Sequence, residues 1–274
     1  EIDFIENSQQ RYAASSLDNF TSEHTQLHVI HAIEWSQDFS LTTKAYVNRF
    51  DRDWMKFDGF VDLDNCVSTD CSHAVADVLA DPVRYSREMA LLRGDANSVV
   101  DADSSEIIDI TNNARQYGSQ GVELVGEYSL GDFHRIDVGA RYHHDYVERD
   151  HQQYGFLMLD RALVSDGVDY APKTQNRSEA DAVALFVNYQ FEWDAIKANV
   201  GARYESIDSQ VTDRMDNDVV TDASTTIVIP GAGIFWQFSE TIGLLAGINK
   251  GFSPAVAGSG ADPEESINYE WGVR

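Results

Sequence analysis

Apolar and polar residues alternate along the best-patterned segments of this chain, and this period of two most limits what it can fold into. Between Val183 and Phe191 every odd position is Val, Leu, Tyr or Phe, while the even positions include Asn188 and Gln190. The same alternation is present in residues 136–142, 196–204 and 267–273. Successive side chains of a β-strand point to opposite faces, so these segments are predicted strands with one apolar and one polar face.

Similar segments predict about nine strands in an all-β, antiparallel chain. The expected strands cover residues 23–36, 39–54, 116–129, 133–149, 179–192, 195–209, 224–238, 241–253 and 265–274. Tight turns near 37–38, 130–132, 192–194 and 239–240 alternate with long connections over 55–115, 150–178, 210–223 and 254–264. This alternation predicts successive hairpins, with tight turns along one edge of the sheet and long loops along the other.

The longest connection contains a predicted helical insertion between Ala74 and Arg93. Asp81 and Pro82 suggest an N-cap followed by a first-turn proline, and Gly94 suggests a C-terminal stop. Apolar residues at helical spacing are Val75, Val78, Leu79, Tyr85, Met89 and Leu92.

The same connection holds the two cysteines of the chain, Cys66 and Cys71. They are interpreted either as two free thiols or as a local disulfide that closes a small surface loop. The disulfide is expected if the loop faces an oxidising space, because the two residues are near neighbours.

Alternation alone does not distinguish a soluble sandwich or lipocalin-like barrel, apolar inside, from a membrane barrel, apolar outside. A helical membrane protein is excluded, because the longest apolar run is the six residues 182–187 and a spanning helix needs about 20. Apolar stripes end in aromatic residues such as Tyr142 and Tyr204, as interfacial girdles require. Together with the alternating connection lengths, this favours a transmembrane β-barrel segment with short periplasmic turns and long extracellular loops.

Energetics then predict which face lies toward the lumen. An arginine turned toward lipid costs up to about 2 to 4 kcal/mol near the bilayer midplane. The charged residues of the polar faces are therefore expected to point inward, into a wet lumen. These lumen-facing candidates are Arg135, Asp137, Arg141, Lys197, Arg203 and Glu205.

The charge of the chain excludes nucleic-acid binding and bears on whether the long connections can bind an anion. A formal net charge of −26 excludes a sequence-independent nucleic-acid binder, because phosphate contacts need a basic surface. Much of the acidic excess lies in the long connections, and residues 56–114 contain 12 acidic and 4 basic residues. An anionic ligand needs converging cations, and this connection does not supply them.

No motif predicts a metal site, a cofactor or an enzyme. Residues 142–151 are rich in possible ligands, but His143 and Asp145 share one strand face while His144 and Glu148 share the other. This stretch is better interpreted as a polar strand end that enters a loop. The acidic pairs of the long connections lack the EF-hand pattern, and neither a Gly-x-Ser-x-Gly elbow nor a phosphate-binding loop is present.

Two motifs near the end of the chain indicate a family. Residues 249–254 read NKGFSP, and residues 262–274 read DPEESINYEWGVR. They resemble a GFSP strand end, a loop and a PE.S.NYE.G.R strand of TonB-dependent outer-membrane receptors, in particular the ferric dicitrate transporter group. Further segments similar to that group are 11–22, 91–95, 117–123 and 229–231.

The resemblance implies a 22-stranded barrel whose lumen is filled by an N-terminal plug. It also implies uptake of a ferric chelate, of the siderophore or iron-citrate type, in the outer membrane of a Gram-negative cell. Residues 1–274 are expected to be a partial barrel domain, without the plug, the TonB box and the remaining strands. The expected partners are the TonB complex, reached through the missing plug, the chelate and outer-membrane lipid.

Two other classes remain open at this point. One is a diffusion porin or surface adhesion barrel without a plug. The other is a soluble acidic sandwich, which predicts that Tyr142 and Tyr204 are buried.

Overall fold

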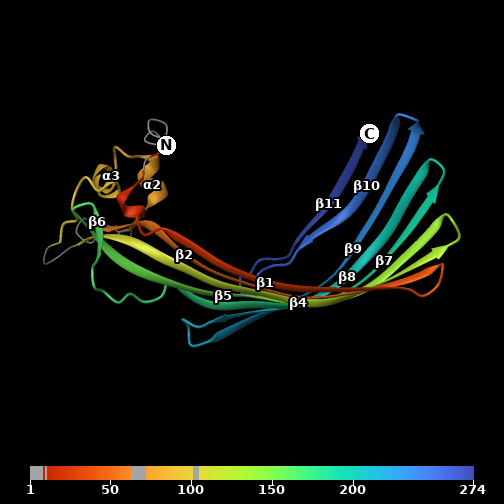
Figure 1. Ribbon diagram of the computed structural model, residues 1–274, viewed down its shortest axis with the longest axis horizontal. Helices are drawn as coiled ribbons and strands as arrows, with labels where there is room; N and C mark the ends of the chain where they lie inside the picture. Colours follow the sequence, from red (N-terminus) through yellow and green to blue (C-terminus); the bar gives the residue numbers. More distant parts are fainter. Residues whose placement is uncertain (1–8, 10, 63–71, 101–104) are drawn as a thin grey trace. The chain divides into compact units, whose positions relative to one another are not determined.

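Nine long strands form one antiparallel sheet in the computed structural model, which describes residues 9, 11–62, 72–100 and 105–274. Cys66 and Cys71 of the expected disulfide lie outside the described residues. The long strands are β1 (Asn19–Glu34), β2 (Phe39–Asp62), β4 (Glu106–Leu130), β5 (His134–Leu159), β7 (Thr174–Trp193), β8 (Ile196–Asp213), β9 (Val219–Ser239), β10 (Ile242–Ser253) and β11 (Glu264–Val273). They are hydrogen-bonded in chain order, as Figure 1 shows.

The predicted hairpin pattern is confirmed, and the strands reach further into the long connections than the pattern indicated. β2 continues to Asp62, β4 begins at Glu106 and β5 ends at Leu159. Two short strands add to these extensions, since β3 (Ser72–Ala74) pairs with β2 and β6 (Ala162–Ser165) pairs with β5. These extensions lack clean alternation, because their two faces are not divided between an apolar and a polar solvent.

The chain separates into two compact units, which are described one at a time. Unit 1 consists of Glu1–Glu23, Asp51–Gln116 and Glu148–Gln175. Unit 2 consists of His24–Phe50, Tyr117–Val147 and Asn176–Arg274.

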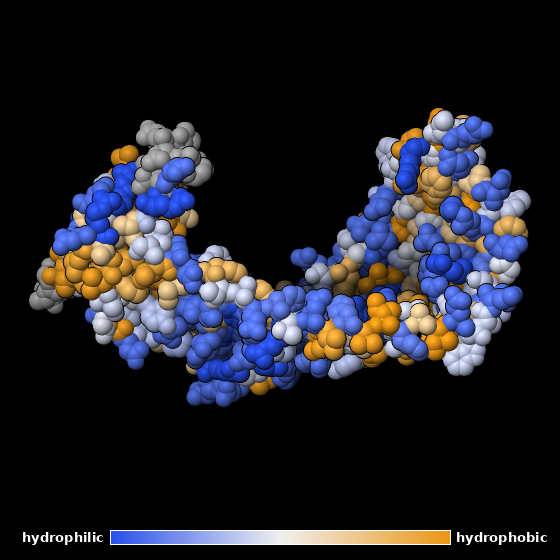
Figure 2. All heavy atoms as spheres, in the orientation of Figure 1, coloured by the Kyte–Doolittle hydropathy of each residue, from blue (hydrophilic) through white to orange (hydrophobic). Residues whose placement is uncertain are grey.

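Unit 2 displays a continuous apolar face on its strands. Strand register places Leu185 opposite Tyr204, Tyr204 opposite Val228, and Ile234 opposite Ala246. Leu185 is 54% exposed and Tyr204 is 41% exposed, so this face has no protein cover in the described chain. Other large apolar residues exposed in unit 2 include Val183, Val187, Val200, Val228, Ile234, Trp236, Phe238, Ile248, Ile267, Tyr269 and Trp271. Figure 2 shows hydrophobic residues in patches on the surface of these strands.

This exposure distinguishes the membrane and soluble interpretations of the alternation. A water-soluble monomer rarely shows contiguous apolar patches beyond a few hundred Å². The soluble sandwich requires Tyr142 and Tyr204 to be buried, whereas they are 44% and 41% exposed. The apolar face of unit 2 therefore suits lipid rather than a packed protein core.

Unit 1 has an ordinary hydrophobic core instead. The helices α2 (Val75–Ala80) and α3 (Ser86–Arg93), with the 3₁₀ turn η1 (Ala13–Ser15), accompany the strand extensions. Figure 2 shows hydrophobic residues gathered in this part of the molecule, at the left of the view. The buried cluster consists of Ala14, Phe57, Phe60, Val78, Met89, Leu91, Leu92, Ile108, Ile110 and Met158. A core of this kind forms when a folded chain buries its apolar side chains away from water.

The helical insertion is confirmed, although it is two short helices rather than one. Asp81 ends α2, and its Oδ1 accepts a hydrogen bond from the Arg84 amide at 3.1 Å. Asp81 therefore caps the turn between the helices, and α3 begins later than Pro82, at Ser86. Gly94 ends α3 with a φ of 74°, a left-handed conformation that glycine adopts without strain. No helix in the described ranges has the length and apolarity needed to cross a membrane.

Candidate functional site

The polar face of unit 2 carries the six lumen-facing candidates, and five of them form three ion pairs. Arg135 Nε lies 3.1 Å from Asp137 Oδ1. Lys197 pairs with Glu192, and Arg203 pairs with Glu205 on the same strand. This face is opposite the apolar one, because Arg203 and Glu205 flank Tyr204 along β8. Tyr204 pairs with Leu185 of the apolar face, whereas Arg203 pairs with Phe186 and Glu205 with Ala184. Their contact with a lumen or plug stays a prediction.

Side-chain hydrogen bonds join neighbouring strands across this polar face. Asp137 Oδ2 accepts hydrogen bonds from Gln190 at 2.6 Å and from Asn188 at 3.1 Å. Arg141 donates to Tyr46 Oη at 2.8 Å, and Tyr46 Oη lies 2.5 Å from His143 Nδ1. The candidates are therefore held in place by one another and by their neighbours, which suits a rigid wall.

The two faces divide the histidines of residues 142–151, as the alternation predicted. His143 contacts Tyr46 on the polar face, whereas His144 Nδ1 lies 3.1 Å from Asp181 on the other. Within the described ranges, no three His, Cys, Asp or Glu residues are grouped as they would be around a metal ion.

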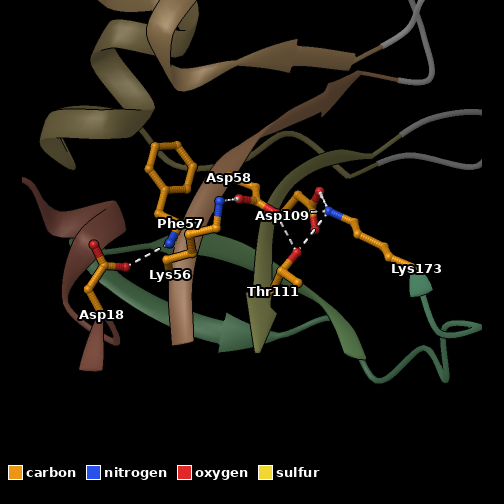
Figure 3. A network of polar contacts seen from close by, with 7 residues as sticks. All are labelled: Asp18, Lys56, Phe57, Asp58, Asp109, Thr111 and Lys173. Atoms are coloured by element: carbon orange, nitrogen blue, oxygen red, sulfur yellow. Dashed lines mark hydrogen bonds and ion pairs between the residues drawn. The ribbon is translucent and has the colours of Figure 1, made fainter. Parts of the chain in front are cut away.

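A second polar network lies in unit 1 and surrounds Lys173 (Figure 3). Lys173 Nζ lies 2.6 Å from Asp109 Oδ2, 3.1 Å from Asp58 Oδ2 and 2.8 Å from Thr111 Oγ1. Lys56 Nζ lies 2.6 Å from the other oxygen of Asp58. These contacts join β2, β4 and the segment that enters β7. Counted from the tight turns, Asp58 of β2 and Asp109 of β4 lie beyond the roughly 9 to 11 residues of a strand that cross a bilayer.

Electrostatics separate the two aspartates of the Lys173 network. Burial raises the pKa of Asp109, and the contact with Lys173 offsets this only in part. Burial also acts on Asp58, but hydrogen bonds from Lys56, Thr111 and Lys173 outweigh it and lower the pKa of that carboxyl group. Burial lowers the pKa of Lys173, whereas the two carboxylates raise it by more. The network is therefore built around a charged lysine.

Next to this network lies an arginine cluster, which we define as Arg52, Arg115, Arg149 and His151. The Lys173 amide donates to the His151 carbonyl at 2.8 Å, so the two groups are adjacent. His151 is only 9% exposed, and Arg115 Nε donates to its Nε2 at 3.1 Å. Burial, followed by the charges of Arg115, Arg149 and Arg52, lowers the pKa of His151.

The hydrogen bond from Arg115 defines the state of the imidazole. Its Nε2 accepts a hydrogen bond from a guanidinium, so the ring is neutral with its own proton on Nδ1. The charges of Arg115, Arg149 and Arg52 outweigh that of Asp150 at this nearly buried ring, so the ring lies in a locally positive region of an acidic chain. Such a region recognises anions, because guanidinium groups bind carboxylates and phosphates with two parallel hydrogen bonds.

Sequence analysis missed this cluster, although a signal was present. Arg52 and Arg149 lie near the ends of predicted strands 39–54 and 133–149, and Arg115 comes directly before strand 116–129. In successive hairpins these three positions fall at the same edge, the one with long loops. All three arginines lie outside residues 56–114, the connection in which acidic residues dominate.

The family is decided by a match along almost the whole chain. Residues 4–274 match the family described as TonB dependent receptor-like, beta-barrel. The chain belongs to the TonB-dependent receptor β-barrel family. No curated protein sequence matches it.

Solved structures with a similar fold include a ferric citrate transporter and receptors for other ferric compounds. The unliganded ferric citrate transporter FecA matches with a TM-score of 0.68 and 14% identity, over 100% of this chain and 35% of FecA. The closed form of the ferric-catecholate import receptor Fiu from E. coli K12 gives 0.61 and 10%, over 96% of this chain and 40% of Fiu. BauA, the ferric preacinetobactin receptor from Acinetobacter baumannii, gives 0.59 and 8%, over 94% and 36%.

The TonB-dependent receptor fold accounts for the exposed apolar face of unit 2 and for the separate hydrophobic core of unit 1. The chain spans between about a third and two fifths of these structures, so it corresponds to one portion of such a barrel. The family is one of outer-membrane transporters and receptors, which agrees with the exposed apolar face of unit 2. Unit 1, with its own core, then contains the long connections of a TonB-dependent receptor, expanded into a folded body.

Proposed function

We propose that the full-length protein is a receptor in a Gram-negative outer membrane that takes up an anionic ferric chelate. The arginine cluster contacts the chelate in this proposal. The single observation that carries it is the hydrogen bond from Arg115 to the nearly buried His151, whose pKa the charges of Arg149 and Arg52 also lower. The names of the similar structures, a ferric citrate transporter among them, support an iron chelate as the ligand class.

The long-range field of the chain makes the cluster necessary for such a ligand. A net charge of −26 repels an anion at a distance. Salt screens that repulsion over about 8 Å at physiological ionic strength, so contacts at short range decide binding. Arginine forks in a partly desolvated position supply those contacts, and citrate-type or catecholate-type chelates supply the matching oxygens.

The test is uptake by the full-length protein in an iron-starved cell that lacks other receptors. Ferric citrate serves as the anionic probe, and a neutral ferric trihydroxamate serves as its counterpart. Arg115→Ala removes one charge-assisted contact, worth about 1.5 to 3 kcal/mol. The half-saturating concentration of ferric citrate is expected to rise roughly tenfold to a hundredfold.

Arg161→Ala is the matched control in the same unit. Arg161 lies 3.3 Å from Asp95, is two-thirds exposed and is not a member of the cluster. Its variant is expected to take up ferric citrate as the parent does. Equal losses in both variants, or an unchanged Arg115→Ala variant, would contradict the role of the cluster.

The remaining parts of the proposal concern the longer protein. A receptor of this family is expected to carry a plug and a TonB box upstream of the present residues, through which it contacts the TonB complex. The open reading frame upstream tests this directly. A signal peptide followed immediately by strands would instead support a plugless porin or adhesion barrel.

A further inference from the structure

The apolar face of unit 2 contains a groove that the uptake of a chelate does not use. It has a volume of about 620 Å³, in the range of about 300 to 1,000 Å³ for small-molecule sites. Its lining includes Val200 of β8, Pro230 and Ala232 of β9, Ile248 of β10 and Ile267 of β11. Register pairs Val200 with Ala232 and Ala232 with Ile248, so these side chains lie on the same face.

The groove arises from small side chains and from a proline. Ala232 lies between larger neighbours on both adjacent strands, so the surface is hollow along β9. The β9–β10 ladder runs from Ile242 and Ser239 to Asn249 and Gly231, and the next residue of β9 is Pro230, which has no N–H to donate. Beyond Gly231, β9 stays paired with β8 and β10 with β11, so the strands diverge (Figure 1).

One charged pair stands at the loop-side end of the groove. Lys250 Nζ lies 2.9 Å from Glu265 Oε2, and both residues line the groove. Lys250 is eight residues from Ile242, which begins β10 after a tight turn. With a strand tilt of about 35 to 45°, eight residues rise about 20 Å across a band about 25 Å tall. The backbone of Lys250 therefore lies within about 5 Å of the loop-side edge of this band, and its long side chain can extend to the lipid headgroups.

We propose that this groove binds a phosphate-bearing lipid of the surrounding membrane. An acyl chain lies along Val200, Ala232 and Ile248, and a headgroup phosphate accepts a hydrogen bond from Lys250 Nζ. An ammonium group has three N–H donors, so Lys250 can contact the phosphate and Glu265 together. The inference goes beyond chelate uptake and rests on the proposed membrane location of the receptor.

The charge contact decides the specificity of this site. Lipid tails are as apolar as the groove, so moving a tail from the bilayer into it gains little hydrophobic free energy. Shape determines where the chain lies, and Lys250 determines which headgroup is retained. One basic residue near an anionic surface is expected to change the affinity about fivefold.

Native mass spectrometry of the purified full-length receptor tests the proposal, with lipid A as the probe in detergent. Ala232→Trp fills the groove and is expected to lose most bound lipid. Lys250→Gln is expected to bind about fivefold less, and Glu265→Gln more, because Lys250 is then shared with no carboxylate. Lipid A stripped of its phosphates is expected to bind to the parent as weakly as intact lipid A binds to Lys250→Gln.

Leu185→Trp is the matched control, since it adds the same ring to the apolar face outside the groove. It is expected to bind lipid as the parent does. Equal binding to Ala232→Trp and Leu185→Trp, or equal binding of intact and phosphate-free lipid to the parent, would overturn the proposal. If Ala232→Trp does not insert, Ala232→Leu and the two charge variants decide the same question.

These outcomes are independent of the proposed uptake. Lipid binding is measured without chelate, and the groove variants are expected to keep ferric citrate uptake. Loss of lipid binding in the parent would leave the receptor proposal intact, and failure of uptake in Arg115→Ala cells has no bearing on the groove.

Discussion

Removing the amino group of Lys173 is expected to loosen unit 1 without unfolding the barrel. In a Lys173→Met variant, Asp109 and Asp58 lose the cation that lies 2.6 and 3.1 Å away. The side chain of Asp109 is 13% exposed and that of Asp58 is 23% exposed, so water replaces the lost contact only in part.

The size of the effect follows from this partial burial. An exposed ion pair contributes about 0 to 1 kcal/mol, whereas removing one partner of a fully buried pair costs about 3 to 5 kcal/mol. Lys173 is 32% exposed and lies between these limits, so we expect a loss of about 2 kcal/mol. The free energy of local opening falls by that amount, and amide exchange quickens roughly thirtyfold.

Hydrogen exchange of the full-length protein, read by mass spectrometry, measures this loss in the peptides of β4 and α3. The pH dependence gives a second signature. The pKa of Asp109 is already raised by burial, so in the variant its charged form is disfavoured further. Stability tied to a raised carboxyl pKa is present at low pH and lost as pH rises through that pKa. The variant is therefore expected to approach the parent as the pH is lowered.

Lys56→Met is the control for this experiment. Lys56 Nζ contacts Asp58 at 2.6 Å, but its side chain is more exposed, at 36%. Its loss is expected to cost less than about 1 kcal/mol. Equal exchange in the Lys56→Met and Lys173→Met variants, or a Lys173→Met variant that departs further from the parent as the pH falls, would refute the reasoning.

Two further variants test other parts of the chain. An added Cβ at Gly139 overlaps the Phe186 ring, whereas at Gly247 it meets only the Ala232 carbonyl oxygen, at 3.6 Å. Gly139→Ala is therefore expected to lower the free energy of unfolding in urea by about 1 to 3 kcal/mol, and Gly247→Ala by much less. Because the pKa of His151 is lowered in the folded state, the stability contributed by this residue is present above about pH 6.5 and is lost as the pH falls. Amide hydrogen exchange in residues 148–159 is therefore expected to quicken below that pH in the parent but not in the His151→Gln variant.

Alternation predicted the parts of the fold that face two different environments. In residues 183–191 and 196–204 every second residue belongs to one apolar face, and the structure pairs these two segments across the predicted tight turn at 192–194. Tight turns were predicted equally well, because a short connection allows only a hairpin between the two strands that it joins. The sequence was therefore sufficient for nine strands and for placing the charged candidates on the face opposite the apolar one.

The extensions in unit 1 were less predictable for a physical reason. Ile108 and Ile110 are fully buried, yet so is neighbouring Thr111, because helices and strands cover β4 from more than one side. Alternation fails where both faces of a strand are enclosed. The Lys173 network was hidden for another reason, since Asp58, Asp109 and Lys173 are far apart in sequence and only long-range pairing brings them together.

The arginine cluster lies where the strands leave unit 1, and this position explains its composition. Arg52 and Arg149 are the second residues of their segments of unit 1, and Arg115 is the second-last residue of its segment. Beyond these positions the same strands carry the exposed apolar face of unit 2, where a lipid-facing guanidinium would be costly. Within unit 1, partial burial strengthens the interaction of an anion with arginine, while the core and the Lys173 network hold the strands in place. In the proposed uptake, a chelate bound there would contact groups positioned by a folded body rather than by mobile loops, so less entropy would be lost on binding.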